Sequence, residues 1–131
     1  MSGNRAVLDS NLLIFLSKGM IDRKKLRSDR GGFCVSIITY MEVYAFDFQD
    51  NSQKNILDEL FRTLEIVEIN QEIADQTIIY RKNKIKRIKL PDAIILATAK
   101  IIEADLITDN LSDFRGVDDL VTLVGIDDLR V

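Results

Sequence analysis

Short apolar runs alternate along the chain with longer segments in which apolar residues recur at helical spacing. Most of the short runs are bounded by glycine, asparagine, aspartate or serine, a pattern that is typical of buried strands. The strands that we expect are AVLD (6–9), GGFCVSI (31–37), EIVEI (65–69), ADLITDN (104–110) and VTLVG (121–125).

The segments between these runs predict helices, because their apolar residues gather on one face at a period of about 3.6 residues. ITYMEVYAFDFQ has apolar residues at 38, 41, 45 and 48, which is helical spacing. Residues 19–30 form a basic connection that we expect to be helical in part. The expected helices are SNLLIFLSK, ITYMEVYAFDFQ, SQKNILDELFRTL (52–64), QEIADQTIIYRKNKI and the proline-initiated LPDAIILATAKII (90–102).

Strands that alternate with helices predict an α/β fold, in which a parallel sheet is covered by helices on both faces. A chain of 131 residues suits one such domain. We therefore expect a single domain over residues 1–131, with a central parallel sheet of four to five strands flanked by helices. In sheets of this kind, sites form at the carboxyl ends of the strands.

Acidic residues occur at the ends of several of these runs. Asp9 ends the first strand, and Glu42 lies on the helix that follows the second. Asp92 begins the most apolar helix, Asp109 ends the fourth strand, and Asp113 lies one helical turn further on. Taken alone, most of these acids also fit ordinary roles as caps, turn residues or solvated surface groups. Their joint placement after strands predicts that all five meet at one edge of the sheet.

The composition restricts the chemistry that such a cluster can perform. The chain has no histidine and one cysteine, so it contains no serine–histidine triad and no histidine- or thiolate-ligated zinc. Four or five carboxylates cannot all stay ionised together without a cation. Oxygen ligands favour Mg²⁺ or Mn²⁺, and such a site suits phosphodiester chemistry.

The remaining features bear on location and partners. No apolar run reaches the ~18–20 residues of a membrane span, and the first residues do not resemble a signal peptide, so we expect a cytoplasmic protein with no membrane partner. The net charge is −3, but residues 81–89 contain six basic residues and no acid. Lys84, Lys86, Arg87 and Lys89 are candidates for RNA phosphate contacts beside Asp92, and the alternative is a solvated helical face.

Four segments together resemble the PIN domain family, especially its VapC-type ribonuclease toxins: VLDSNLLI, VSIITYMEV, LPDAIILATA and LITDNLSDF. The resemblance covers the whole chain in the order and spacing of the family. It implies that Asp9, Glu42 and Asp92 are the first three acids of a metal site. The fourth position stays open between Asp113, Asp109 and Asn110. The groups that would orient the carboxylates are Ser10, Asn11, Ser36, Thr108 and Asn110.

The function that this resemblance implies is a Mg²⁺- or Mn²⁺-dependent endoribonuclease that cleaves RNA with a metal-activated water. It also implies a VapB-like antitoxin partner and a homodimer. One alternative is a PIN-domain nuclease of RNA maturation. Another is a non-enzymatic Mg²⁺-binding receiver-like module, although Asp9 has no adjacent acid and EIVEIN offers no phosphoacceptor aspartate. A haloacid-dehalogenase-like phosphatase would need Asp-x-Asp where this chain has Asp9-Ser10-Asn11.

Overall fold

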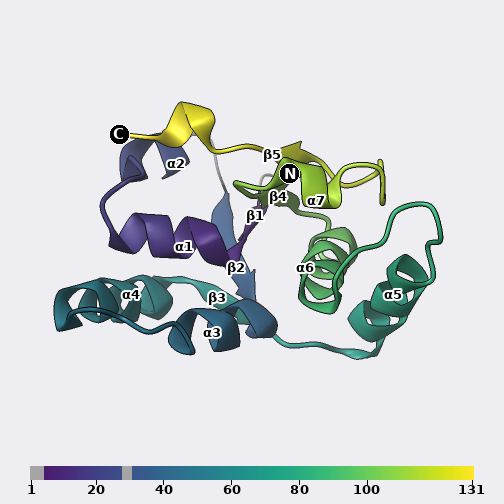
Figure 1. The fold of residues 1–131 in the computed structure, drawn as a ribbon, viewed down its shortest axis with the longest axis horizontal. Coiled ribbons are helices and arrows are strands. Elements are labelled where there is room, and N and C mark those ends of the chain that lie inside the picture. The colour runs from purple at the N-terminus through teal and green to yellow at the C-terminus, as the bar shows by residue number, and fades with distance from the viewer. Residues whose placement is uncertain (1–4, 28–30) are drawn as a thin grey trace.

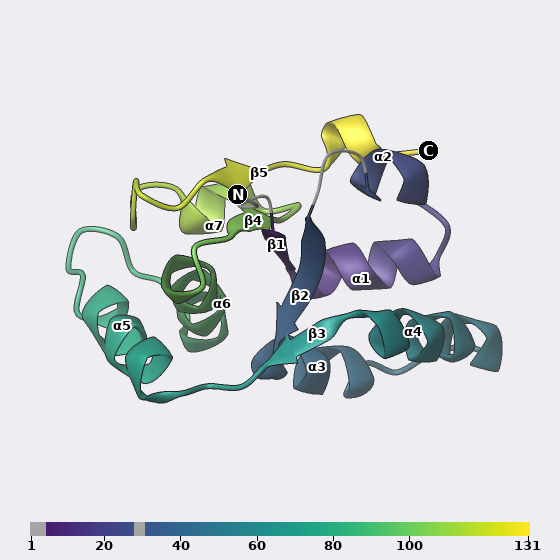
Figure 2. The same cartoon turned by 180° about the vertical axis from the view of Figure 1, so that it is seen from behind.

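The computed structural model describes residues 5–27 and 31–131, and its centre is a parallel sheet of five strands (Figure 1). The strands are β1 (Arg5–Leu8), β2 (Gly32–Ser36), β3 (Glu65–Val67), β4 (Asp105–Ile107) and β5 (Leu123–Val124). Their spatial order is β3-β2-β1-β4-β5, with β3 visible at one edge in Figure 2. This confirms the parallel α/β fold. The order differs from the 2-1-3-4-5 order of receiver-type domains, so the receiver-like alternative is wrong.

Helices cover both faces of the sheet (Figures 1 and 2). The helices are α1 (Ser10–Ser17), α2 (Arg23–Arg27), α3 (Ile37–Tyr44), α4 (Asn51–Thr63), α5 (Gln71–Arg81), α6 (Leu90–Ile101), α7 (Leu111–Phe114) and the 3₁₀ helix η1 (Asp127–Leu129). Successive residues of a strand point to opposite faces of the sheet. Val7, Cys34 and Leu106 therefore pack under α5 and α6, whereas Leu8, Val35 and Ile107 pack on the side of α1 and α4. The single cysteine is fully buried, as expected of a small apolar residue.

Helix α6 is the most deeply buried element. All seven residues from Ala93 to Ala99 are buried, and Thr98 donates its hydroxyl hydrogen to the carbonyl of Ile94. Pro91 lies in the first turn, where its missing N–H leaves no helical bond unmade. A helix buried on all sides cannot tilt without opening the core, so the backbone of its first turn, with Asp92, is held in place.

Two expected helices end earlier in the structure. Helix α3 stops at Tyr44, so the expectation that positions 38, 41, 45 and 48 share one helix is wrong. Its buried residues are Thr39 and Val43, while Met41 is 51 % exposed. At the start of this helix, the Ser36 hydroxyl accepts from the N–H of Ile38 and caps the first turn.

The expectation that the helix of residues 71–85 reaches Ile85 is also wrong, because α5 ends at Arg81. The side-chain oxygen of Asn83 accepts hydrogen bonds from the N–H groups of Ile85 and Lys86, which forms a turn instead of another helical repeat. Arg81 then donates to the carbonyl of Ile88 at 2.7 Å. The basic segment is therefore a loop that leads directly into α6, and hydrogen bonds hold it at both ends.

Among the residues that the structure describes, no helix combines the length and the apolarity needed to cross a membrane.

Candidate metal centre at the carboxyl edge of the sheet

Four acids from separate parts of the chain surround one cavity of about 250 Å³. Asp9 follows β1, Glu42 lies on the helix after β2, Asp92 lies in the first turn of α6, and Asp113 lies on α7, after β4. They meet because β2, β1 and β4 are neighbours and run in parallel. The other residues that line the cavity are Ser10, Asn11, Ile14, Val43, Phe46 and Asn110.

Asp9 is the most firmly held of the four acids. It is 8 % exposed and caps α1: one carboxylate oxygen accepts from the N–H of Ser10 at 2.7 Å, and the other accepts from the Thr108 hydroxyl at 2.6 Å. Burial raises the pKa of Asp9, and the charges of Asp109 and Glu42 add to that rise, although the two hydrogen bonds oppose it. The sequence between β1 and α1 thus places a carboxylate where ionisation is unfavourable.

The other carboxylates are oriented by small polar side chains. The Ser10 hydroxyl donates to Glu42 at 2.6 Å, and the side-chain amide of Asn110 donates to Asp113. Thr108 connects the two halves of the cavity, because its hydroxyl oxygen also accepts from the N–H of Asn110 at 3.0 Å.

Two residues expected to orient the carboxylates lie differently. The Ser36 hydroxyl caps α3 and acts on Glu42 only through the helix, whereas Asn11 lines the cavity as an exposed side chain.

Asp92 shows the electrostatic state of the cluster most clearly. Its pKa is raised to about 6, first by burial and then by the charges of Asp9, Asp113 and Glu42, while Lys89 lowers it. The first turn of a helix favours a negative charge by ~0.3–1 kcal/mol. A shift of about two units corresponds to ~3 kcal/mol, so burial and repulsion outweigh the helix end. The charges of the other three acids therefore act on Asp92.

Asp109 is placed differently from the other predicted acids, because it does not line the cavity. Its Oδ1 atom is buried and has no hydrogen-bond partner among the described residues. Its charge nevertheless contributes to the raised pKa of Asp9. Asp113 is consequently the acid that faces the cavity after β4, with Asn110 beside it.

The donor set fits a hard divalent cation. All available ligands are oxygens, the acids repel one another, and the buried Asp109 oxygen lacks a partner. Within residues 5–27 and 31–131, however, no group of three acids is arranged to hold one ion directly. Ser10, Thr108 and Asn110 turn the carboxylates toward themselves instead. Magnesium usually keeps several of its waters, so these acids can reach an ion through water or by a small rotation.

The basic loop meets the same site. A smaller cavity of about 80 Å³ is lined by Asp92 and Asp113 together with Lys86, Arg87 and Lys89 of the loop, and by Ile88. The Lys86 ammonium donates to the carbonyl of Ser112 on α7. Lys84 lines a different cavity, together with Arg81, Lys82 and Arg87. Three of the four predicted phosphate-binding residues therefore lie beside the acids.

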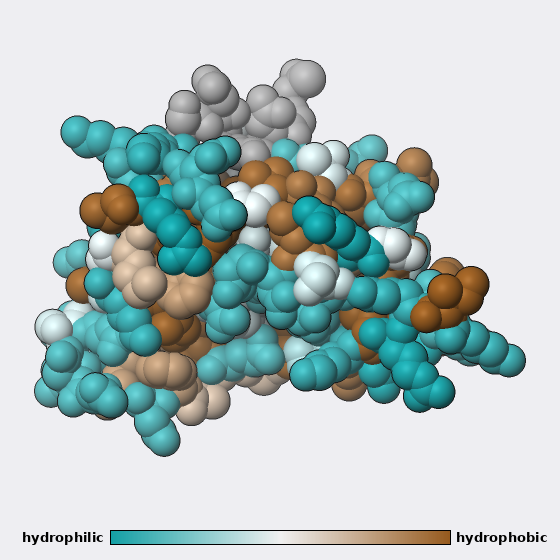
Figure 3. Space-filling model, turned by 45° about the horizontal axis from the view of Figure 1, so that its top comes forward, coloured by the Kyte–Doolittle hydropathy of each residue, from teal (hydrophilic) through white to brown (hydrophobic). Residues whose placement is uncertain are grey.

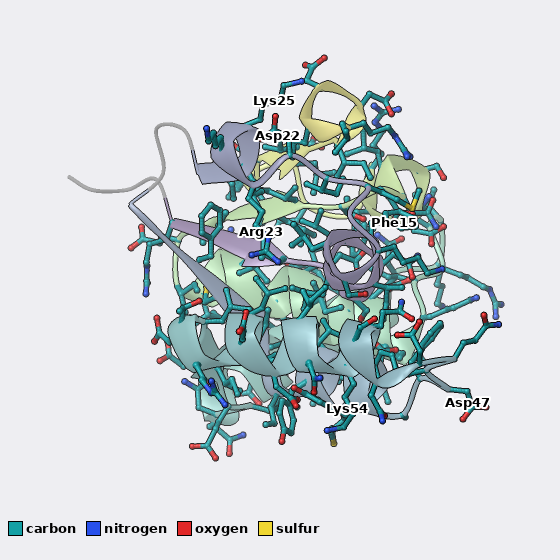
Figure 4. The ribbon with its side chains drawn as sticks, turned by 90° about the vertical axis from the view of Figure 1, so that its left-hand side faces the viewer. Phe15, Asp22, Arg23, Lys25, Asp47 and Lys54 are labelled. Carbon is teal, nitrogen blue, oxygen red and sulfur yellow. The ribbon has the colours of Figure 1, made fainter. Side chains whose placement is uncertain are left out.

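The other basic segment lies elsewhere on the molecule. Figure 4 shows Arg23 directed from α2 toward α4, and Arg23 lines an apolar hollow with Leu60 and Leu64. The Lys25 ammonium donates to the carbonyl of Arg130 at 3.3 Å. The end of this segment, residues 28–30, lies outside the described residues.

The sequence analysis missed the apolar wall of the acidic cavity, formed by Ile14, Val43 and Phe46. Phe46 follows Glu42 by four positions, but its role could not be inferred as long as α3 was expected to continue past it.

Comparison with known proteins agrees with this geometry. A family model described as "PIN domain" matches residues 6–120. A structure described as a toxin–antitoxin complex from Klebsiella pneumoniae is 34 % identical, covers 89 % of this chain and 95 % of its own, and has a TM-score of 0.69. The structure of VapBC2 from Rickettsia felis bound to a promoter DNA fragment is 20 % identical and has a TM-score of 0.79. The match covers 94 % of this chain and 99 % of the other. The structure of DNA-bound VapBC from Salmonella typhimurium is 22 % identical and has a TM-score of 0.76. The match covers 93 % of this chain and 98 % of the other. No curated protein sequence matches.

Removing one carboxylate should stabilise the metal-free protein. The pKa of Asp92 is about 6 in the folded state and about 4 when unfolded, so the folded state holds the proton more tightly between these values. Stability therefore falls as the pH rises from about 4 to about 6. In EDTA at pH 7, Asp92→Asn should raise the free energy of unfolding by about 1–3 kcal/mol, measured with urea, and the gain should vanish near pH 4.

Glu59→Gln is the matched control, because Glu59 is an exposed acid on α4, away from the cavity lining. It should change stability by less than about 0.5 kcal/mol at either pH. A destabilised Asp92→Asn protein at pH 7 in EDTA would contradict the picture of mutually repelling acids.

Proposed function

The chain belongs to the PIN domain family, and we propose that it is a Mg²⁺- or Mn²⁺-dependent endoribonuclease, the toxin of a VapBC-type toxin–antitoxin pair. One observation carries the proposal: Asp9, Glu42, Asp92 and Asp113 come from four separate segments and surround one cavity, where burial and neighbouring charges raise the pKa of Asp9 and Asp92. A protein keeps such a cluster at a cost in stability, which a bound cation relieves.

Asp9, Glu42, Asp92 and Asp113 would hold the ion, and Asp109 would add charge behind Asp9. When bound, Mg²⁺ or Mn²⁺ supplies a Lewis acid that lowers the pKa of a water and neutralises charge on the phosphoryl group. Thr108 and Ser10 restrain the carboxylates, so that these side chains lose little conformational freedom when substrate binds.

The basic loop supports RNA as the substrate class. Lys86, Arg87 and Lys89 border the acids on one side, so a phosphate held by these cations lies next to the carboxylates. The acids alone would repel a polyanion, and the loop supplies the opposite charge where the backbone enters. Such contacts hold the RNA in position and leave the choice of sequence to other groups.

A VapB-like antitoxin is the proposed protein partner, which the 34 % identical protein from Klebsiella pneumoniae supports because its structure is described as a toxin–antitoxin complex. An RNA substrate and this partner imply a cytoplasmic location.

We further propose a homodimer. Ile78 and Ile79 on α5 are 51 % and 61 % exposed, and Ile85 in the adjoining loop is 99 % exposed. Figure 3 shows apolar atoms protruding at the end of the molecule where α5 and this loop lie. Exposed apolar side chains that gather in this way are typical of an interface, and a second copy would bury them.

The proposed reaction is tested by cleavage of single-stranded RNA. Purified protein should cleave in Mg²⁺ or Mn²⁺, leave 5′-phosphate and 3′-hydroxyl ends, and stop in EDTA. Asp9→Asn and Asp92→Asn should each lower the rate by about 10²-fold or more, because each removes a charge that the ion requires. Glu59→Gln should leave the rate unchanged. Full activity in EDTA, or in either aspartate variant, would rule out the metal-dependent mechanism.

The loop is tested by the salt dependence of RNA binding. Each phosphate contact contributes a log–log slope of about −0.7 on a single strand, so replacing Lys86 and Arg87 by glutamine should flatten the slope by about one unit or slightly more. Lys24→Gln with Lys25→Gln changes the net charge equally on α2 and should leave the slope unchanged. The bonds that are cut should stay the same. An unaltered slope in the folded loop variant would instead indicate a solvated surface.

A further inference from the structure

Part of the wall of the acidic cavity is apolar. Ile14 and Val43 form its buried part, at 7 % and 1 % exposed, and Phe46 stands at its margin with 41 % of its surface exposed. Phe46 shares this cavity with the four acids and presents part of its ring to the open space. The ring therefore lies where a ligand at the carboxylates would touch it.

The backbone and a second ring hold Phe46 in this position. After α3 ends, the N–H of Phe46 donates to the carbonyl of Val43 at 3.2 Å. The Phe46 ring meets Phe48 edge to face, with centroids 5.3 Å apart and planes at 61°. Phe48 packs against the core, so it supports Phe46 from the protein side. The connection that carries both rings lies at the edge of the molecule, where Asp47 points outward (Figure 4).

A cation accompanies the ring. The ammonium of Lys18, at the end of α1, lies 5.9 Å from the centroid of Phe46. This is near the outer limit of a cation–π contact, about 6 Å, so the lysine is weakly held and its charge is available to an anion. The same margin of the cavity thus offers a flat apolar face and a positive charge, the two groups that single-stranded nucleic acids require.

Other aromatic residues of this region lie differently. Tyr40, Tyr44 and Phe61 contact one another with centroids 5.1–5.4 Å apart. The Tyr44 hydroxyl donates to Asp58 at 2.7 Å. These rings pair within the α3–α4 surface and do not line the acidic cavity. Of the aromatic residues that the structure describes, Phe46 is the one in that lining.

We propose that Phe46 is the platform on which one base of single-stranded RNA stacks next to the phosphate at the carboxylates, and that Lys18 contacts the adjoining phosphate. This inference rests on the proposed ribonuclease function and adds a positioning residue to it. Stacking on an aromatic ring tolerates every base, so Phe46 would fix where the strand lies without selecting a sequence. It would also compensate for the repulsion between the acids and the RNA backbone.

The test is a double-mutant cycle between the ring and the base. Binding of a labelled single-stranded RNA of about 12 nucleotides would be compared with a series carrying one abasic site at successive positions. The Asp92→Asn background in Mg²⁺ prevents cleavage during the measurement. One abasic position should weaken binding by about 5- to 150-fold, and Phe46→Leu should weaken binding of the intact RNA similarly. In the Phe46→Leu protein, removing the base at that sensitive position should not weaken RNA binding further.

Matched variants separate stacking from folding. Phe46→Trp should restore affinity, because tryptophan offers a larger face for the base. Tyr40→Leu removes an exposed ring that does not line the acidic cavity and should retain the full abasic effect. Lys18→Gln should flatten the salt slope by about 0.7.

The inference is overturned if the Phe46→Leu protein binds every RNA as tightly as the protein with Phe46 does. It is also overturned if the abasic site still weakens RNA binding by the Phe46→Leu protein. If the wild-type protein cleaves RNA in Mg²⁺ in that case, only the role of Phe46 falls. If the wild-type protein neither binds nor cleaves RNA, the proposed function falls with it.

Discussion

Mutual repulsion among carboxylates in a partly buried cavity is the constraint on which the rest of the site depends. Burial raises the pKa of Asp92, and the charges of Asp9, Asp113 and Glu42 raise it further. Burial also raises the pKa of Asp9, with a further rise from the charges of Asp109 and Glu42. The fold keeps them together because it leaves them little freedom. Asp9 is bonded at both oxygens, and Asp92 begins a helix whose next seven residues are buried. The surrounding core thus maintains a charge arrangement that is unfavourable by itself.

The groups around the acids supply positive charge and apolar surface, which the acids themselves do not offer to a ligand. On one side Lys86, Arg87 and Lys89 supply positive charge for a phosphate, and on the other Phe46 offers an apolar face. Each comes from a segment that leaves its helix just before the cavity: the loop after α5 and the connection after α3. The early ends of these two helices therefore supply the cationic and apolar walls around the acids.

The sequence was most informative where a single strong local signal decides the structure. The apolar run before Asp9 and the proline before Asp92 indicated a strand end and a helix start, and the parallel sheet followed from the alternation of elements. It was least informative where one side-chain hydrogen bond decides, as when Asn83 ends α5. Near Asp109 and Asp113, the Thr108 hydroxyl accepts from the nearby N–H of Asn110 and donates to Asp9, which is 99 positions away in the sequence. The contact with Asp9 exists only once the sheet has formed, so the sequence left the fourth acid open.

The most direct test of this account is a carbon-13 NMR titration of the Asp92 carboxyl group, without metal and with Mg²⁺. The account predicts that the pKa of Asp92 is about 6 in EDTA and falls below its ordinary value of about 4 when Mg²⁺ binds, because the cation replaces the repulsion of the neighbouring acids with attraction. A pKa near 4 in EDTA that Mg²⁺ leaves unchanged would contradict it, since the four acids would then be independent and would hold no ion.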